Sequence, residues 1–213
     1  MRSTTISRSQ ARQIYNRLGR DLERANRFEG RAKAMALALL DSTPGMQVLH
    51  VGVGTGSEHA ALDHAVAPHG LVIGYDLARG MLQHTRQRVD TPICEGDALH
   101  LPFVSQHFDG VFSAYMLDLI PLAEIPLILS EFHRVLRPGG RLVLVSLTEG
   151  VDRASRLFVA GWKLVYRLNP QRLGGCRPLQ LADLLGQAGF CVERHTVIQR
   201  GFPSEVLLGM RIN

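Results

Sequence analysis

The chain has 213 residues and a mass of 23.5 kDa, a size that suits one domain with small additions and disfavours repeat arrays or two full domains. With 46% hydrophobic and 20% charged residues, it has the composition of ordinary globular proteins rather than of disordered or membrane-spanning ones. The net charge is +5, and residues 1–33 hold nine basic residues against three acidic ones. The rest of the chain is nearly neutral, which disfavours nucleic acid as its partner.

The N-terminus and the cysteines indicate a reducing compartment. Cys94, Cys176 and Cys191 are odd in number and lack CxxC spacing, so we expect neither a disulfide framework nor a metal site. The first residues are polar and arginine-rich, without the apolar stretch of a secretory signal. They also have the composition of an organellar transit peptide, a reading we rank second to a cytoplasmic protein.

The predicted elements alternate between helices and strands along most of the chain. Helices are expected at residues 10–25, 28–41, 57–67, 78–88, 121–135 and 179–188. Strands are expected at residues 47–51, 71–76, 92–94, 108–114, 141–147, 190–199 and 205–212. This alternation predicts an α/β, Rossmann-like fold: a mostly parallel seven-stranded sheet with helices on both faces.

The last quarter of the chain departs from that rhythm. The two final strands are joined by a short Gly/Pro loop, so they are expected to form an antiparallel C-terminal hairpin. Residues 150–178 remain as an insertion, within which residues 157–168 read as an apolar, aromatic helix. We therefore divide the chain into a basic helical cover, residues 1–42, and a main domain, residues 43–213.

A glycine-rich turn follows the first strand. Gly52, Gly54 and Gly56 let the backbone and the next helix approach a polar ligand closely, and Asp76 ends the second strand, where a carboxylate can accept hydrogen bonds from ribose hydroxyls. Ser57 occupies the position of the third glycine in a dinucleotide fingerprint. The pattern therefore favours a nucleoside ligand and disfavours a nicotinamide-dependent oxidoreductase.

Five sequence blocks occur in a recognisable order. They are Val48-Leu49-His50-Val51-Gly52-Val53-Gly54-Thr55-Gly56, Tyr75-Asp76, Glu95-Gly96-Asp97-Ala98 followed by Leu101-Pro102-Phe103, Phe108-Asp109-Gly110-Val111, and Arg134-Val135-Leu136-Arg137-Pro138-Gly139-Gly140. Together they resemble the class I S-adenosylmethionine-dependent methyltransferases, and most of all the branch with the quinone-biosynthesis C-methyltransferases and phospholipid N-methyltransferases. The resemblance covers roughly residues 45–150.

The resemblance implies S-adenosylmethionine as cofactor and assigns its contacts. The loop beside the methionine portion would comprise Gly52, Val53, Gly54 and Gly56. Asp76 would hold the ribose hydroxyls, and Ser113 would line the methionine end. The adenine would be contacted by Leu77, Asp97 and Ala98. Purely structural roles explain two of these residues nearly as well: Asp97 could cap a loop, and Ser113 could simply be the last residue of a strand. His50 stands where the family usually has Asp or Glu, so we expect weaker cofactor binding.

Methyl transfer is a direct displacement that depends mainly on alignment, so no obligatory catalytic motif is expected. Tyr115 and Asp118 are the candidate acceptor contacts or proton acceptors, although a packed ring and a helix N-cap are the favoured readings. Trp162 and Tyr166 in the insertion either contact a lipophilic or aromatic acceptor from a lid or complete the core. Both alternatives stay open.

The sequence thus predicts a methyltransferase for a small acceptor. The first alternative is a cofactor-binding protein without catalysis, for which His50 is the reason. A nucleic-acid methyltransferase is disfavoured by the neutral main body and the absence of an Asn-Pro-Pro-Tyr-like or cysteine-based motif. Contact between the basic N-terminal segment and a membrane is a minority hypothesis.

Overall fold

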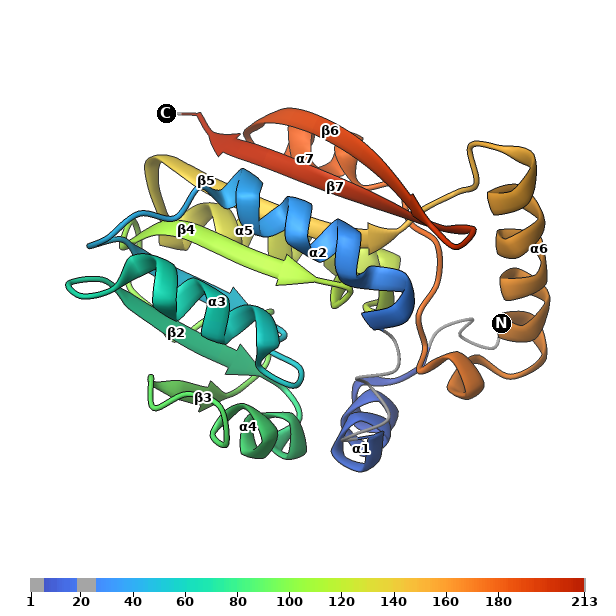
Figure 1. The fold of residues 1–213 in the computed structure, drawn as a ribbon, viewed down its shortest axis with the longest axis horizontal. Helices are drawn as coiled ribbons and strands as arrows, with labels where there is room; N and C mark the ends of the chain where they lie inside the picture. The colour runs from blue at the N-terminus through green and yellow to red at the C-terminus, as the bar shows by residue number, and fades with distance from the viewer. Residues whose placement is uncertain (1–5, 19–25, 213) are drawn as a thin grey trace.

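The computed structural model describes residues 6–18 and 26–212 and contains a seven-stranded sheet (Figure 1). The strand order is β3-β2-β1-β4-β5-β7-β6, and only the pairings of β7 are antiparallel. The strands are β1 (Gln47–Val51), β2 (Leu71–Asp76), β3 (Ile93–Glu95), β4 (Phe108–Ala114), β5 (Leu136–Leu147), β6 (Phe190–Gln199) and β7 (Phe202–Arg211). This confirms the predicted mostly parallel sheet and its C-terminal hairpin.

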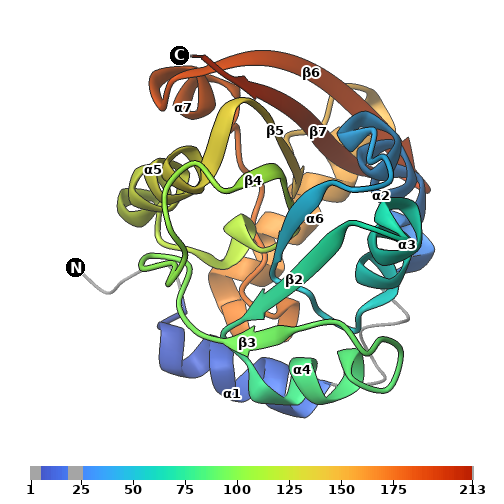
Figure 2. The same cartoon turned by 90° about the vertical axis from the view of Figure 1, so that its left-hand side faces the viewer.

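Helices cover both faces of the sheet. They are α1 (Arg8–Leu18), α2 (Asn26–Leu40), α3 (Ser57–Val66), α4 (Arg79–Thr85), α5 (Ile125–Val135), α6 (Arg153–Leu168) and α7 (Ala182–Gln187). The short 3-10 helices are η2 (Leu117–Leu119), η3 (Leu122–Glu124) and η4 (Pro170–Leu173). Figure 2 shows α5 and α7 on one side of the sheet and α2 and α3 on the other.

The core is divided by the sheet into two apolar clusters. The side chains of Leu49 and Val111 join those of α5 and α7 on one face. On the other face, Val48 and Phe112 join α2 and α3. Alternate residues of the same strands thus point to opposite faces, as the pleat of a doubly covered sheet requires.

Several boundaries differ from the sequence-based expectations. The helix expected from residue 121 begins at Ile125, because the chain first makes two 3-10 turns. Strand β5 begins at Leu136 rather than Arg141, and its pairing with β4 shifts register between Phe108 and Gly110. The turn that the sequence places before residue 141 lies within this strand. Residues 19–25 of the first expected helix lie outside the described residues.

The first two helices lie in different places. Helix α2, which the sequence grouped with the basic cover, packs on the sheet through the buried residues Ala32, Ala36 and Leu40. Helix α1 lies beside α4 at the carboxyl ends of the parallel strands (Figures 1 and 2), where Asn16 accepts a hydrogen bond from the Gly80 N–H at 2.8 Å. Within the described residues, no helix is both long and apolar enough to cross a bilayer.

Candidate functional site

A cavity of about 390 Å³ opens where β1 and β4 end side by side. This is the point at which the connections from neighbouring strands diverge to opposite faces of the sheet, the usual ligand position in open α/β folds. Its walls come from the β1–α3 loop, the ends of β2 and β4, and helices α1, α2 and α6. The volume lies in the range of small-molecule pockets.

The β1–α3 loop forms one wall through its backbone. Gly52, Gly54 and Gly56 have φ angles of 77°, 56° and 87°, a region in which side chains are strained. A Cβ at Gly52 would lie 2.8 Å from the Cβ of Met116, whereas a Cβ at Gly54 would meet nothing within 4 Å. Gly54 therefore leaves open space at the cavity, while Gly56, which packs against Thr85, is not among the lining residues.

Asp76 lies at the end of β2 and lines the cavity. Its Oδ1 accepts a hydrogen bond from the Ala78 N–H at 2.8 Å, and its Oδ2 accepts one from the Gly54 N–H at 3.2 Å. Burial raises the pKa of Asp76 to about 6, although these two bonds act in the opposite direction. The carboxylate is thus fixed against the glycine loop and retains lone pairs for a ligand's hydroxyl groups.

Acidic side chains at the rim of the cavity pair with arginines of α1. Arg8 lies between Asp97 and Glu124, with its Nε 3.4 Å from Asp97 Oδ2 and a terminal nitrogen 2.6 Å from Glu124 Oε2. Arg12 pairs with Glu95. The basic helix therefore covers the side of the cavity formed by Asp97, Leu77 and Ala98, all of which are lining residues expected from the sequence.

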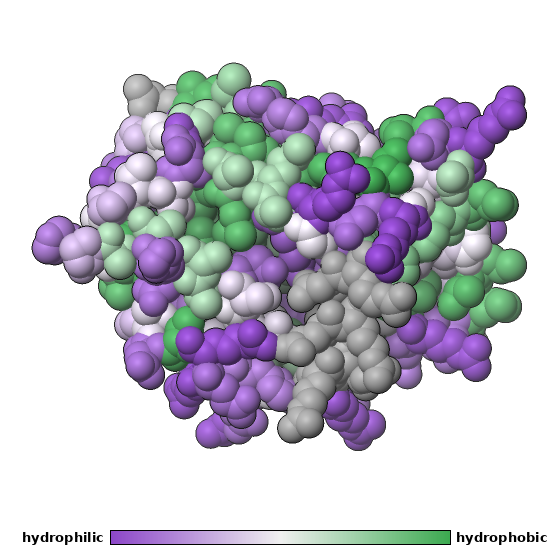
Figure 3. Space-filling view, viewed as in Figure 1, coloured by the Kyte–Doolittle hydropathy of each residue, from purple (hydrophilic) through white to green (hydrophobic). Residues whose placement is uncertain are grey.

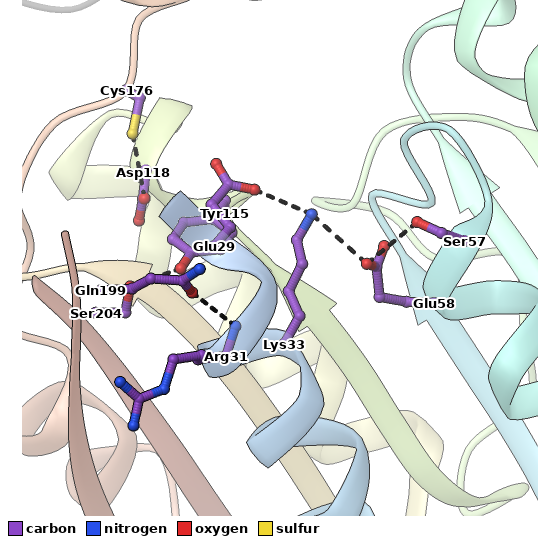
Figure 4. Close-up of polar contacts among 10 residues, drawn as sticks. All are labelled: Glu29, Arg31, Lys33, Ser57, Glu58, Tyr115, Asp118, Cys176, Gln199 and Ser204. Atoms are coloured by element: carbon purple, nitrogen blue, oxygen red, sulfur yellow. Dashed lines mark hydrogen bonds and ion pairs between the residues drawn. The ribbon is translucent and has the colours of Figure 1, made fainter. Parts of the chain in front are cut away.

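A partly buried lysine lies between two carboxylates on another part of the wall. Lys33 Nζ is 3.0 Å from Glu29 Oε2 and 3.6 Å from Glu58 Oε1, and all three side chains line the cavity (Figure 4). Burial opposes the charge on Lys33, but the two carboxylates outweigh it and raise the lysine pKa. This places a cation and two anions beside a glycine loop that has no charged side chain of its own.

His50 is fully buried at the same end of the cavity. Its ring stacks on His59 with centroids 5.6 Å apart and meets Phe112 edge-on at 5.2 Å. Burial, the nearby His59 and Lys33 hold the pKa of His50 well below its usual range. The ring is therefore neutral and supplies no charge to the site.

Tyr115 follows directly after the end of β4, whereas Ser113 lies within the strand. Tyr115 lines the cavity, and its hydroxyl lies 2.6 Å from Ser204 Oγ (Figure 4). Burial and the neighbouring Glu29 raise the pKa of Tyr115, which keeps the phenol protonated. Ser113 is buried within the sheet and is not among the lining residues, whereas its neighbour Ala114 is. The alternation along β4 therefore turns Ser113 away from the cavity.

Asp118 is fully buried behind the cavity wall rather than capping a helix. Its Oδ2 accepts hydrogen bonds from the Leu147 N–H at 2.9 Å and from the Cys176 thiol at 3.4 Å. Burial raises the pKa of Asp118 to about 8 and that of Cys176 well above its usual range. Cys176 lines the cavity and Asp118 does not, so the carboxyl group ties the insertion to β5.

Aromatic rings from α2, α6 and β7 form a cluster at the cavity, to which Trp162 and Phe202 contribute lining side chains. Phe202 lies 5.6 Å from Phe158 and 5.7 Å from Trp162 between ring centroids, and Phe28 of α2 joins them at 6.2 Å from Phe202. Trp162 lines the cavity and donates its indole N–H to the Cys176 carbonyl at 2.9 Å. Tyr166 is buried but is not a lining residue.

Several lining residues were not expected from the sequence. They include Tyr15, Glu29, Lys33, Glu58 and Phe202. The spacing of Glu29 and Lys33, four apart on one helix, is the one local signal that could have drawn attention to this charge cluster. Within the described part of the chain, no group of three or more His, Cys, Asp or Glu side chains is arranged to hold a metal ion.

Comparison with known proteins agrees with this architecture. Residues 48–140 match the family model described as a methyltransferase domain. The chain is 40% identical over 129 residues to a demethylmenaquinone methyltransferase of Symbiobacterium thermophilum, covering 56% of this chain and 50% of that protein. It is 34% identical over 133 residues to a 2-phytyl-1,4-naphtoquinone methyltransferase of Synechococcus elongatus, covering 59% and 56%. The chain thus spans about half the length of these relatives.

Solved structures share the fold across nearly the whole chain. The magnesium protoporphyrin IX methyltransferase of Synechocystis with bound SAH matches at a TM-score of 0.73 and 20% identity, covering 96% of this chain and 99% of that one. The sheet order and the matched domain define a class I methyltransferase fold. Within that class, the sequence is similar over about 130 residues to the two quinone methyltransferases named above.

Proposed function

We propose that the protein transfers a methyl group from S-adenosylmethionine to a small lipophilic or aromatic acceptor. The observation that carries this proposal is the partly buried Asp76 carboxylate, held by the Gly54 and Ala78 N–H groups on the wall of a cavity of about 390 Å³. A charged acceptor in such a place is costly unless a ligand donates to it. Ribose hydroxyl groups are donors of the required kind.

The lining residues fit the rest of this cofactor. Leu77, Ala98 and Asp97 offer an apolar surface and a hydrogen-bond acceptor for the adenine. Lys33 would hold the carboxylate of the methionine portion. Glu58, or Glu29, would hold its ammonium group. These two glutamates supply the negative charge that the neutral His50 cannot, so we expect His50 to be compatible with cofactor binding.

The cofactor supplies an activated methyl group, and the protein's task is then to align an acceptor with it. Trp162 and Phe202 provide flat apolar surfaces against which a ring can lie. The protonated Tyr115 hydroxyl can donate to an oxygen of the acceptor but cannot take its proton at neutral pH. If the acceptor must lose a proton, Glu29 is the carboxylate beside Tyr115 on the cavity wall.

Quinone-type rings are the acceptors we favour. The two sequence relatives are named for demethylmenaquinone and 2-phytyl-1,4-naphthoquinone, each a ring with a lipophilic character that suits the aromatic wall. The alternative of cofactor binding without catalysis rested on His50. With Glu29 and Glu58 in the same cavity, the missing carboxylate at position 50 no longer favours it.

The test is transfer of a tritiated methyl group from S-adenosylmethionine to a reduced naphthoquinone that lacks a ring methyl group. We expect label in the organic phase with the wild-type protein and none with Asp76→Asn. Label that appears equally with Asp76→Asn would contradict the proposed site. Binding of S-adenosylhomocysteine without transfer to quinol, phenol or amine acceptors would instead support the non-catalytic alternative.

A further inference from the structure

Helix α6 exposes large apolar side chains on its outer surface. Leu157, Leu164 and Leu168 are 77%, 59% and 79% exposed, and Val165 beside them is 38% exposed. Their spacing of seven and four residues places them on one face of the helix. In Figure 3, hydrophobic residues gather at the right-hand side of the molecule, where Figure 1 places α6. Such a stripe on one helix marks an interaction surface.

The protein itself uses only the inner half of the apolar face of α6. On its inner side, the α6 side chains of Val159 and Tyr166 are buried, and those of Phe158 and Trp162 pack on Phe202. The outer leucines add nothing to this packing. The helix is therefore apolar over a wider arc than the protein covers, which is typical of helices that lie at an interface.

Positive charge borders the exposed stripe. Arg156, Lys163 and Arg167 also follow a spacing of seven and four residues, so they lie along one edge of it. Residues 153–182 contain six basic residues and no acidic one. Lys163 pairs with Glu149 at 2.5 Å, and the long side chains of the arginines can reach beyond the helix while their stems stay on apolar surface.

From this surface we infer that α6 docks the protein on a membrane containing anionic lipids, with Leu157, Leu164 and Leu168 entering the acyl boundary and the bordering arginines meeting lipid phosphates. Apolar side chains beside a basic edge match the acyl region and the anionic headgroup region of such a membrane surface. A purely apolar partner would leave the arginines without counter-charge. The inference goes beyond methyl transfer, because docking needs no cofactor.

The same helix connects this surface with the cavity. Trp162 lines the cavity from the inner face of α6, and the exposed leucines lie on the outer face within two turns of it. Docking through α6 would therefore place this wall of the cavity next to the membrane. The basic helix α1 is less suited to the membrane role, because Arg8 and Arg12 are paired with acidic groups at the rim of the cavity.

The experiment is co-sedimentation of the full chain with phosphatidylcholine vesicles and with vesicles of equimolar phosphatidylcholine and phosphatidylglycerol. We expect wild-type protein to bind the anionic vesicles more tightly. Leu164→Ser/Leu168→Ser should lower this affinity at least about thirtyfold, because both side chains lose apolar contact with the acyl region. The control is Leu122→Ser/Leu127→Ser, which removes leucines 60% and 59% exposed elsewhere and should bind like wild type.

A second pair of variants tests the charge. Arg156→Gln/Arg167→Gln should lower the affinity for anionic vesicles about twentyfold and change binding to pure phosphatidylcholine little. Its control, Arg79→Gln/Arg86→Gln, removes the exposed first residue of α4 and the exposed residue that follows the helix, and should leave binding unchanged. Thermal unfolding shows whether each variant is folded, and Leu157→Ser is the single substitution used if the double leucine variant is not.

Three results would overturn the inference. They are wild-type protein that binds neither vesicle, leucine variants that bind as well as their control, and self-association in vesicle-free solution that only the α6 leucine variants abolish. The last result would assign this face to a second copy of the chain. Affinity for S-adenosylhomocysteine, measured without vesicles, should be the same in all α6 variants, so failure of the docking inference is distinguishable from failure of the proposed enzymatic function.

Discussion

The partly buried carboxylate of Asp76 should make the ligand-free protein less stable than it would be with an unperturbed carboxylate at this position. Its pKa is raised from 3.8 to about 6, roughly two pKa units, and each unit corresponds to about 1.4 kcal/mol. At pH 8 the charged Asp76 therefore costs the folded state about 3 kcal/mol. This cost declines as the pH falls through 6 and is absent below 4, where both the folded and the unfolded chain carry the proton.

Asp76→Asn removes the titration, so its effect on stability must depend on pH. The amide can accept only one of the two backbone N–H bonds, which costs about 1–3 kcal/mol at every pH. The free energy of unfolding of the variant, relative to that of wild type, should thus rise by about 3 kcal/mol between pH 4 and pH 8. The variant should be less stable than wild type at pH 4 and equally or more stable at pH 8. The free energy of unfolding in urea at both pH values measures this difference, with the exposed Asp90→Asn as control.

A pH-independent difference between Asp76→Asn and wild type would refute the reasoning, because it would mean that Asp76 titrates near its ordinary value. Binding is expected to move in the opposite direction from stability. Loss of a charged acceptor for two hydroxyl groups should reduce affinity for S-adenosylhomocysteine by at least about a hundredfold. Wild-type affinity should likewise fall as the pH drops below about 6.

The remaining predictions concern three other side chains. Lys33→Met should lower S-adenosylhomocysteine affinity at least about tenfold in calorimetry, since Glu29 loses its cation and the ligand carboxylate its partner, while the exposed Arg31→Met on the same helix should not; equal affinities would count against the lysine. The His59 pKa is lowered to about 4 by burial, so stability should fall by up to about 3 kcal/mol as the pH drops from 6.5 to 4, and His59→Gln should flatten that fall in urea unfolding; an unchanged slope would contradict it. Phe202→Ala should destabilise the fold by about 3–5 kcal/mol by emptying the aromatic cluster, and a loss under 1 kcal/mol would show that the cluster does not stabilise the fold.

The fold and the glycine loop could be predicted because their signals are local. Each of these signals lies in a short segment that can be interpreted without knowing the tertiary structure. They are the alternation of strands and helices, the glycines at 52, 54 and 56, and Asp76 twenty residues further on. The C-terminal hairpin could be predicted for the same reason. The predicted ends of the helices and strands were less accurate, because the two 3-10 turns before Ile125 and the register shift in β5 depend on packing rather than on propensity.

The side-chain environment of the site was not predictable to the same degree. Ser113 and Ala114 are neighbours on β4, and the sequence does not say which of them faces the cavity. Lys33 meets Glu58 because α2 packs on the same face as α3, a tertiary event with no local signature. Asp118 has the sequence context of a helix cap, but the fold buries it against Cys176 and β5 instead.

The central claim is that the cavity between the glycine loop and Asp76 binds the methyl donor. Calorimetric titration of the wild-type protein with S-adenosylhomocysteine at pH 8 tests it most directly. The account predicts one saturable site per chain, whose affinity Asp76→Asn lowers at least about a hundredfold and Asp90→Asn leaves unchanged. A folded wild-type protein that shows no saturable binding, or an Asp76→Asn variant that binds as tightly as wild type, would contradict it.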